Sequence, residues 1–246
     1  MQVQLRGRDA RHGLEFGSSF TWSHAIDNAS DFFDSAGDYA LPQDSLQPSE
    51  RASSNYDIRL MWVTHFVWNI PSVLPTAVFR DWQISGIVTE RTGQPYTVNS
   101  IYDINQDGNL TDRLDNTIGL LPGGSGRVRL ILTTDPLNLL SATEKVVGAT
   151  GCITSNSQGK LLNSCDGSVG RNTFRADGLH TADVALTRSL AVRERMTILF
   201  RAEAFNLLNH SNFAIPVRLL GAPGFGAAVQ TSVPNRVLQV SMKIRF

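Results

Sequence analysis

The sequence has no apolar run long enough for a transmembrane helix, because charged residues interrupt every candidate stretch in its 246 residues. Such a helix takes about 20 consecutive apolar residues. Met1 leads directly into the polar stretch "QVQLRGRD", so the apolar segment of a signal peptide is also missing. Hydropathy alone would indicate a soluble cytoplasmic protein. Membrane β-barrels escape this test, because every second residue of their strands faces water.

Charge of one sign is not in excess either, since 22 Lys and Arg residues balance 22 Asp and Glu residues. Proteins that bind nucleic acid usually present a basic surface to the phosphate groups. This balance gives no electrostatic reason to expect such a partner, and we expect no nucleic-acid binding.

Cysteine is scarce: Cys152 and Cys165 are the only two, and both lie in the polar stretch "GCITSNSQGKLLNSC". Neither has a second cysteine or a histidine at the spacing of a zinc site. Two cysteines confined to one loop favour a local disulfide and an oxidising compartment. Two free thiols are the alternative.

Patterns typical of catalytic sites are missing as well. The segment 123–126, "GGSG", lacks the lysine and the following helix of a phosphate-binding loop. No histidine stands in a metalloprotease motif or beside a nucleophile motif. The five histidines are His12, His24, His65, His180 and His210. We therefore expect no enzymatic activity.

What the sequence does contain is a repeated alternation of apolar and polar residues, which predicts β-strands. The stretch "LEFGSSFTW" sets Phe16, Phe20 and Trp22 against Glu15 and Thr21. Seven segments carry the pattern: 1–8, 14–26, 56–70, 80–91, 181–190, 197–208 and 236–246.

The connections between these segments alternate in length. Short connections at 9–13, 71–77 and 191–196 follow the first, third and fifth segments, whereas long ones follow the second, fourth and sixth. A compact soluble domain rarely carries long connections without structure of their own. Transmembrane barrels have this rhythm, with short periplasmic turns and long extracellular loops. The sequence thus predicts an all-β fold, an antiparallel transmembrane β-barrel.

The two faces of the predicted strands support this choice over a soluble β-sandwich, which also alternates. The apolar face is rich in Trp and Phe, as the lipid-facing belt of a barrel is. The other face carries small polar residues and charges of both signs, which suits a water-filled lumen. Arg201 and Glu203, for example, share this face and are expected to form a lumenal charge pair.

Seven is an odd number of strands, whereas bacterial single-chain barrels have even numbers. An open sheet in lipid would leave backbone groups unpaired along two edges, at several kcal/mol each. Either further strands escape the pattern, or residues 1–246 are the C-terminal part of one larger barrel domain. The strand-like start at Met1 favours the second explanation.

An ordered set of stretches resembles the C-terminal part of the barrel of TonB-dependent outer-membrane transporters, specifically their Oar-like branch. The stretches are "FTWSHAIDN", "DIRLMWVTHFVWNIP", "DWQISGIVTERTGQPYTV", "DINQDGNLTDR", "FRAEAFNLLNHSNF" and "VLQVSMKIRF". They span nearly the whole chain. The resemblance implies a barrel of about twenty-two strands around an N-terminal plug. No segment of this sequence matches the plug, the TonB box or the signal peptide.

The resemblance also implies a location and a set of partners. We expect the chain in the outer membrane of a Gram-negative cell, in contact with lipid, with the remainder of the barrel and with the plug. It would reach the TonB system through the part of the receptor that this sequence does not match. The implied function is import of a bulky nutrient. The alternatives are a barrel with an adhesive or structural role, and a soluble β-sandwich that binds carbohydrate or protein.

The C-terminal segment ends on an aromatic residue after regular alternation. Val240, Met242, Ile244 and Phe246 occupy every second position. This pattern resembles the signal by which the outer-membrane assembly machinery recognises barrel proteins, and we assign that role to these four residues. A soluble edge strand that happens to end in Phe is the alternative.

The stretch "DINQDGNLTDRLD" is the sharpest local motif. Asp103, Asn105 and Asp107 occupy positions one, three and five of a calcium loop, and Gly108 follows where a sharp turn is needed. Asn109 and Asp112 would complete the site. Leu114 stands where the usual bidentate Glu would be. The sequence predicts a Ca²⁺ ion that braces an extracellular loop; a loop held by Asx turns is the alternative.

Overall fold

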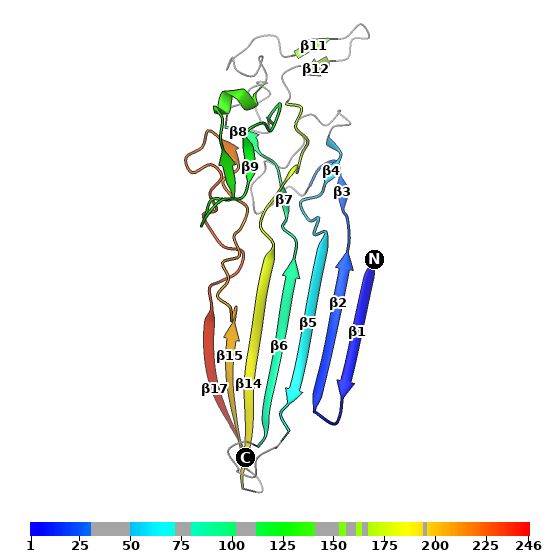
Figure 1. The fold of residues 1–246 in the computed structure, drawn as a ribbon, viewed down its shortest axis with the longest axis vertical. Coiled ribbons are helices and arrows are strands. Elements are labelled where there is room, and N and C mark those ends of the chain that lie inside the picture. The colour runs from blue at the N-terminus through cyan, green and yellow to red at the C-terminus, as the bar shows by residue number, and fades with distance from the viewer. Residues whose placement is uncertain are drawn as a thin grey trace.

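Seven long β-strands form one antiparallel sheet in the computed structural model, which describes residues 1–30, 50–71, 80–101, 112–140, 153–155, 161–163, 167–193 and 196–246. Each strand pairs with its neighbours in chain order (Figure 1). The strands are β1 (Gln2–Asp9), β2 (Leu14–Trp22), β5 (Leu60–Asn69), β6 (Trp82–Arg91), β14 (Leu179–Arg193), β15 (Met196–Phe205) and β17 (Val237–Arg245). The predicted all-β, seven-stranded antiparallel architecture is confirmed. The sheet is open and does not close into a barrel.

One face of this sheet is mainly apolar across all seven strands, with Asp9, Glu90 and Arg188 among its charged exceptions. Residues paired directly across antiparallel strands point to the same side, and the register pairs Phe20 with Trp62 and Phe200 with Met242. Members of this apolar face come from all seven strands: Val3, Leu5, Phe16, Phe20, Trp62, Phe66, Ile84, Val88, Val184, Leu186, Ile198, Phe200, Val240, Met242 and Ile244.

The opposite face is mainly polar. The register places Arg201 beside Ser241 and Glu203 beside Gln239 on this side. The Nη2 atom of Arg201 lies 2.7 Å from Oε1 of Glu203, so the predicted charge pair is confirmed. Apolar exceptions on this polar face include Met61, Val63, Val67, Ile87, Leu179, Leu199, Phe205 and Val237.

Aromatic rings cover three glycines within the sheet. A Cβ atom at Gly7 would lie 2.5 Å from Cε1 of Phe16, and one at Gly86 would lie 2.7 Å from Cε1 of Phe66. On the polar face a Cβ at Gly17 would lie 2.5 Å from Cε1 of His65. The absent side chain lets each ring lie flat over the neighbouring strand, which fixes strand register.

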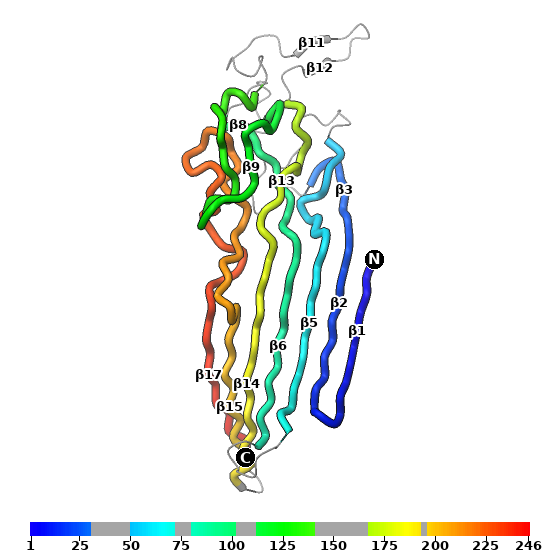
Figure 2. Tube along the Cα trace, in the orientation of Figure 1, coloured from blue at the N-terminus to red at the C-terminus, as the bar shows by residue number. Residues whose placement is uncertain are grey.

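The strand ends that the three short connections join lie at one end of the sheet, and the strand ends that the long connections join lie at the other (Figures 1 and 2). This confirms the predicted rhythm. Some predicted strand ends are wrong: β2 ends at Trp22 and β15 at Phe205, and residues 56–59 precede β5. The structure contains no helix, in its described part, with the length and hydropathy needed to cross a bilayer.

The described residues of the long connections, 23–30, 50–59, 92–101, 112–140, 167–178 and 206–236, fold into what we term the loop cap. It contains the 3-10 helix η4 (Pro136–Leu139), which Asp135 caps by accepting a hydrogen bond from the N–H of Leu137. Its strands are β3 (Ile26–Asp27), β4 (Ala52–Ser53), β7 (Pro95–Tyr96), β8 (Asn99–Ser100), β9 (Leu120–Pro122), β10 (Leu130–Leu132), β13 (Phe174–Arg175) and β16 (Leu219–Leu220). Two more short strands, β11 (Ile153–Ser155) and β12 (Leu161–Asn163), pair with each other.

The buried apolar core of the molecule lies in the loop cap and not on the sheet. The rings of Tyr96 and Phe174 stack with centroids 5.8 Å apart. Burial, followed by the nearby charge of Asp177, raises the pKa of Tyr96, so its phenol stays neutral in alkaline solution as well as at neutral pH. The core consists of Tyr96, Val98, Leu114, Leu120, Leu130, Leu139, Leu140, Phe174 and Leu220.

Buried arginines join parts of the loop cap that are far apart in sequence. Arg113 donates two hydrogen bonds to Glu50, at 2.7 and 2.8 Å, and both side chains are almost fully buried. Arg171, fully buried, pairs with Asp27 across 144 positions of sequence and also donates to Ser30. Charge-assisted bonds of this kind are the strong ones, so the long connections hold one another in place.

Asp57 is a further junction of the loop cap. Its buried carboxylate accepts hydrogen bonds from Arg59, from the N–H of Ala25 and from Arg175. Burial alone would raise the pKa of Asp57, but these three donors lower it to about 2. The sequence had indicated a strand residue here, because Asp57 alternates with apolar neighbours. The structure corrects this: Asp57 anchors the base of the loop cap.

Candidate lumenal site

The apolar face of the sheet is uncovered in the described part of the chain. Trp62 is 53% exposed, Val240 is 80% exposed and Met242 is 59% exposed. A monomeric soluble protein rarely shows a contiguous apolar surface that spans a whole sheet. The alternative fold, a soluble β-sandwich, would bury this face against a second sheet, and no such sheet packs on it among the described strands. The face therefore fits an apolar solvent.

Tryptophans mark both ends of this face. Trp22, paired with Leu60, lies toward the loop cap, whereas Trp68 and Trp82 lie toward the short hairpins. The eight positions from Leu60 to Trp68 span roughly 27 Å along the strand at about 3.4 Å per residue. At the usual tilt of about 35–45° this segment rises roughly 19–22 Å, which covers most of the apolar band of about 25 Å between the aromatic girdles of outer-membrane barrels.

Comparison with protein families agrees with this geometry. The family model described as an outer membrane beta barrel domain matches residues 1–239. The chain belongs to this family. The barrel domain therefore resides in the outer membrane, with its apolar face toward lipid and its polar face toward the lumen. Comparisons with curated proteins and with solved structures found no match.

The C-terminal strand of the barrel domain forms one edge of the sheet. Val240, Met242 and Ile244 lie on the lipid face of β17, and Phe246 follows the strand with 95% of its surface exposed. Among the described strands β17 pairs only with β15. The four residues thus present the regular pattern expected of an assembly signal, and their recognition by assembly machinery stays a prediction.

The lumenal face carries more positive than negative charge, although the whole chain is neutral. Two of its ion pairs are internal, Arg8 with Glu15 at 2.8 Å and Arg201 with Glu203. The strand residues on this face whose side chains the structure describes include six cations, Arg6, Arg8, Arg91, Arg201, Lys243 and Arg245, against three carboxylates, Glu15, Asp183 and Glu203.

Two hollows lie on the lumenal face, and His65 lines both. One, of about 580 Å³, lies between β1, β2 and β5 beside Arg6 and Arg8. The other, of about 390 Å³, lies over β5, β6, β14 and β15 beside Asp183 and Arg201. These hollows on the polar face leave space in the lumen for water or for another part of the protein.

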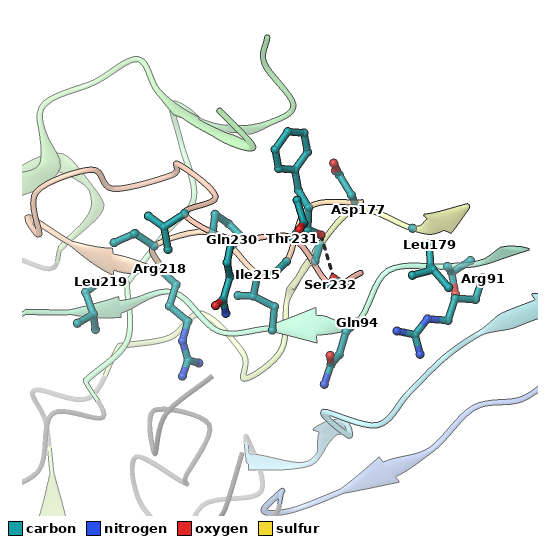
Figure 3. A pocket seen from close by; sticks show the side chains of 18 residues that line it. Arg91, Gln94, Asp177, Leu179, Ile215, Arg218, Leu219, Gln230, Thr231 and Ser232 are labelled. Carbon is teal, nitrogen blue, oxygen red and sulfur yellow. Dashed lines mark hydrogen bonds between the residues drawn. The ribbon is translucent and has the colours of Figure 1, made fainter. Parts of the chain in front are cut away.

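A third cavity, which we term the mouth pocket, lies where the lumenal face meets the loop cap. Its volume is about 580 Å³, and its walls come from the top of β6 and β14 and from segments 213–219 and 229–232 (Figure 3). In Figure 3 the polar ends of Arg91, Gln94, Gln230 and Arg218 extend toward the same side. The pocket is therefore lined by several hydrogen-bond donors.

The charges around the mouth pocket are unequal. Asp177, its acidic member, forms an ion pair of 2.7 Å with Arg129, whose guanidinium also lies 4.8 Å from the centre of the Phe213 ring. Arg91 makes no ion pair and no side-chain hydrogen bond with any residue in the described ranges. The negative charge is thus neutralised while one guanidinium remains available.

The predicted calcium and disulfide sites fall largely outside the described residues. Asp103, Asn105, Asp107 and Asn109 lie there, as do Cys152 and Cys165. Asp112 is described and is fully buried, and its carbonyl accepts a hydrogen bond of 2.8 Å from the N–H of Ser100. Within the described ranges no three His, Cys, Asp or Glu residues are grouped as metal ligands. Both sites stay predictions.

The sequence did not point to the mouth pocket. Its residues come from four separate segments, and only Arg91 carried a local signal, as the charged residue that ends an alternating strand. The charge count on alternate strand positions was available from the sequence and would have indicated the positive lumenal face.

Proposed function

We propose that the barrel domain is the C-terminal part of a TonB-dependent receptor that imports a bulky nutrient across the outer membrane. The observation that carries this proposal is the direction of the two edge strands. In a seven-stranded antiparallel sheet, β1 and β17 run the same way, toward the short hairpins. They cannot pair antiparallel with each other, so closure takes an odd number of additional strands.

The lumenal face supports a wide barrel. An eight-stranded barrel fills its interior with its own side chains, whereas barrels of more than twenty strands have a lumen that a plug occupies. The hollows beside His65 fit the second case. The stretches that resemble Oar-like receptors, from "FTWSHAIDN" to "VLQVSMKIRF", are the support for this specific branch.

The proposal includes the partners of such a receptor. The apolar face would contact lipid, the edges of β1 and β17 the remainder of the barrel, and the polar face the plug. The plug would couple to the TonB system, and the assembly machinery would insert the whole protein. Ca²⁺ would be held by the Asp103–Asp112 loop. No enzymatic activity and no nucleic-acid partner are part of the proposal.

The test begins with the gene. We expect the DNA upstream of the Met1 codon to encode a signal peptide, a TonB box and a plug. The intact protein, extracted in detergent from outer membranes, should then retain the periplasmic domain of TonB on an affinity resin, and deletion of the TonB box should abolish this. An intact protein that has no plug and does not retain TonB would contradict import and favour the adhesive or structural role.

A further inference from the structure

We propose that the mouth pocket is the site that first binds the imported nutrient, and that this nutrient carries carboxylate groups, one of which is bound by Arg91. The inference rests on the proposed import function and adds the chemical class of the substrate. The pocket volume of about 580 Å³ lies within the roughly 300–1,000 Å³ typical of small-molecule sites.

Arg91 is the central residue of the argument. It ends β6 on the lumenal face, it is only partly exposed, and it lines the mouth pocket (Figure 3). A guanidinium withdrawn from water without a partner is unfavourable. Its planar fork of donors matches a carboxylate with two parallel hydrogen bonds. An anionic group of the solute would provide the partner that the described residues do not.

The rest of the pocket suits the uncharged part of such a solute. Gln94 and Gln230 offer amide groups, and Thr231 and Ser232 offer hydroxyls, on the walls around Arg91. Asp177 does not repel an anion as a lone carboxylate would, because Arg129 pairs with it at 2.7 Å. Polar groups that donate or accept hydrogen bonds, together with one available cation, are what an acidic sugar would use.

The positive lumenal face favours the same sign of charge. Arg6, Lys243 and Arg245 form no ion pair with the residues that the structure describes. Fixed charges of one sign along a channel raise the local concentration of oppositely charged solutes and their rate of association.

The experiment uses the intact receptor in detergent and two matched probes, trigalacturonate and its fully methyl-esterified form, which has the same backbone without charge. Calorimetry should show tighter binding of the acid than of the ester. Arg91→Gln should weaken binding of the acid by roughly tenfold or more, as expected for loss of a charge-assisted interaction, and should leave the ester unchanged. Arg91→Lys should retain part of the preference.

Arg11→Gln is the matched control, because it removes the same charge from the turn between β1 and β2, at the other end of the sheet. It should leave both affinities unchanged. Equal binding of acid and ester, no binding of the acid at millimolar concentration, or equal losses in Arg91→Gln and Arg11→Gln would each overturn the proposal. Affinities are measured on folded, heat-modifiable protein only, so poor yield of a variant cannot imitate lost binding.

A second measurement separates the roles of pocket and lumen. Arg6→Gln with Lys243→Gln should slow association of trigalacturonate in low salt and leave its dissociation rate unchanged. If the receptor does not retain TonB but still binds the acid more tightly than the ester, the proposed import is contradicted and the anion site is supported. If the receptor retains TonB but binds acid and ester equally, only the anion site is contradicted.

Discussion

Val240 gives the most direct test of the lipid-facing assignment. It is the fourth of nine residues in β17, close to the middle of the strand, and it is 80% exposed. In a soluble protein, arginine at so exposed a position would change stability by no more than about 0.5 kcal/mol. At the midplane of a bilayer, the same substitution costs about 2–4 kcal/mol. The two environments therefore predict clearly different results for Val240→Arg.

The neighbouring residue supplies the control. Gln239 lies on the lumenal face opposite Glu203, so Gln239→Arg places the new charge in water beside a carboxylate. Ser241 also faces the lumen but lies opposite Arg201, and arginine there would add a modest repulsion. Urea unfolding of the intact protein in lipid vesicles measures each variant. Equal unfolding free energies for Val240→Arg and Gln239→Arg would refute the assignment of the faces.

Three further predictions concern the loop cap and the C-terminus. Since the pKa of Asp57 is about 2 in the folded protein and ordinarily 3.8, we expect its contribution of about 2 kcal/mol to be complete above pH 4 and lost toward pH 2, which unfolding of Asp57→Asn against wild type at several pH values measures. Millimolar Ca²⁺ should protect the Asp103–Asp112 loop from proteolysis, and the double variant Asp103→Ala, Asp107→Ala should lose that protection; a calorimetric titration without heat would end the metal hypothesis. Deletion of Phe246 should reduce insertion into the outer membrane far more than refolding in detergent, because one aromatic side chain contributes only ~1.5–3 kcal/mol; insertion at wild-type levels would leave Phe246 a girdle residue.

The sheet was predictable because its signal is local. In β6, Trp82, Ile84 and Val88 alternate with Gln83 and Thr89, and the face of each residue follows from the period of two. The strand ends were less predictable. Alternation continues through Tyr56 and Ile58, yet β5 begins at Leu60, because Asp57 is held by the loop cap and not by the ladder.

The loop cap could not be predicted from the sequence in the same way. Arg171 pairs with Asp27 across 144 positions, and Arg113 with Glu50 across 63. No periodicity records contacts between such distant segments. Tyr96 and Phe174 likewise meet only because β7 and β13 pair. The mouth pocket depends on this arrangement. The sequence therefore could not predict that its four segments lie close together in space.

The buried arginine ion pairs of the loop cap affect how other molecules recognise the cell surface. Because Asp27, Glu50, Arg113 and Arg171 come from four different stretches and lock together, no single stretch has its shape alone. An antibody or a phage that recognises this surface would read a composite epitope, and a synthetic peptide copied from any one loop would fail to compete for it.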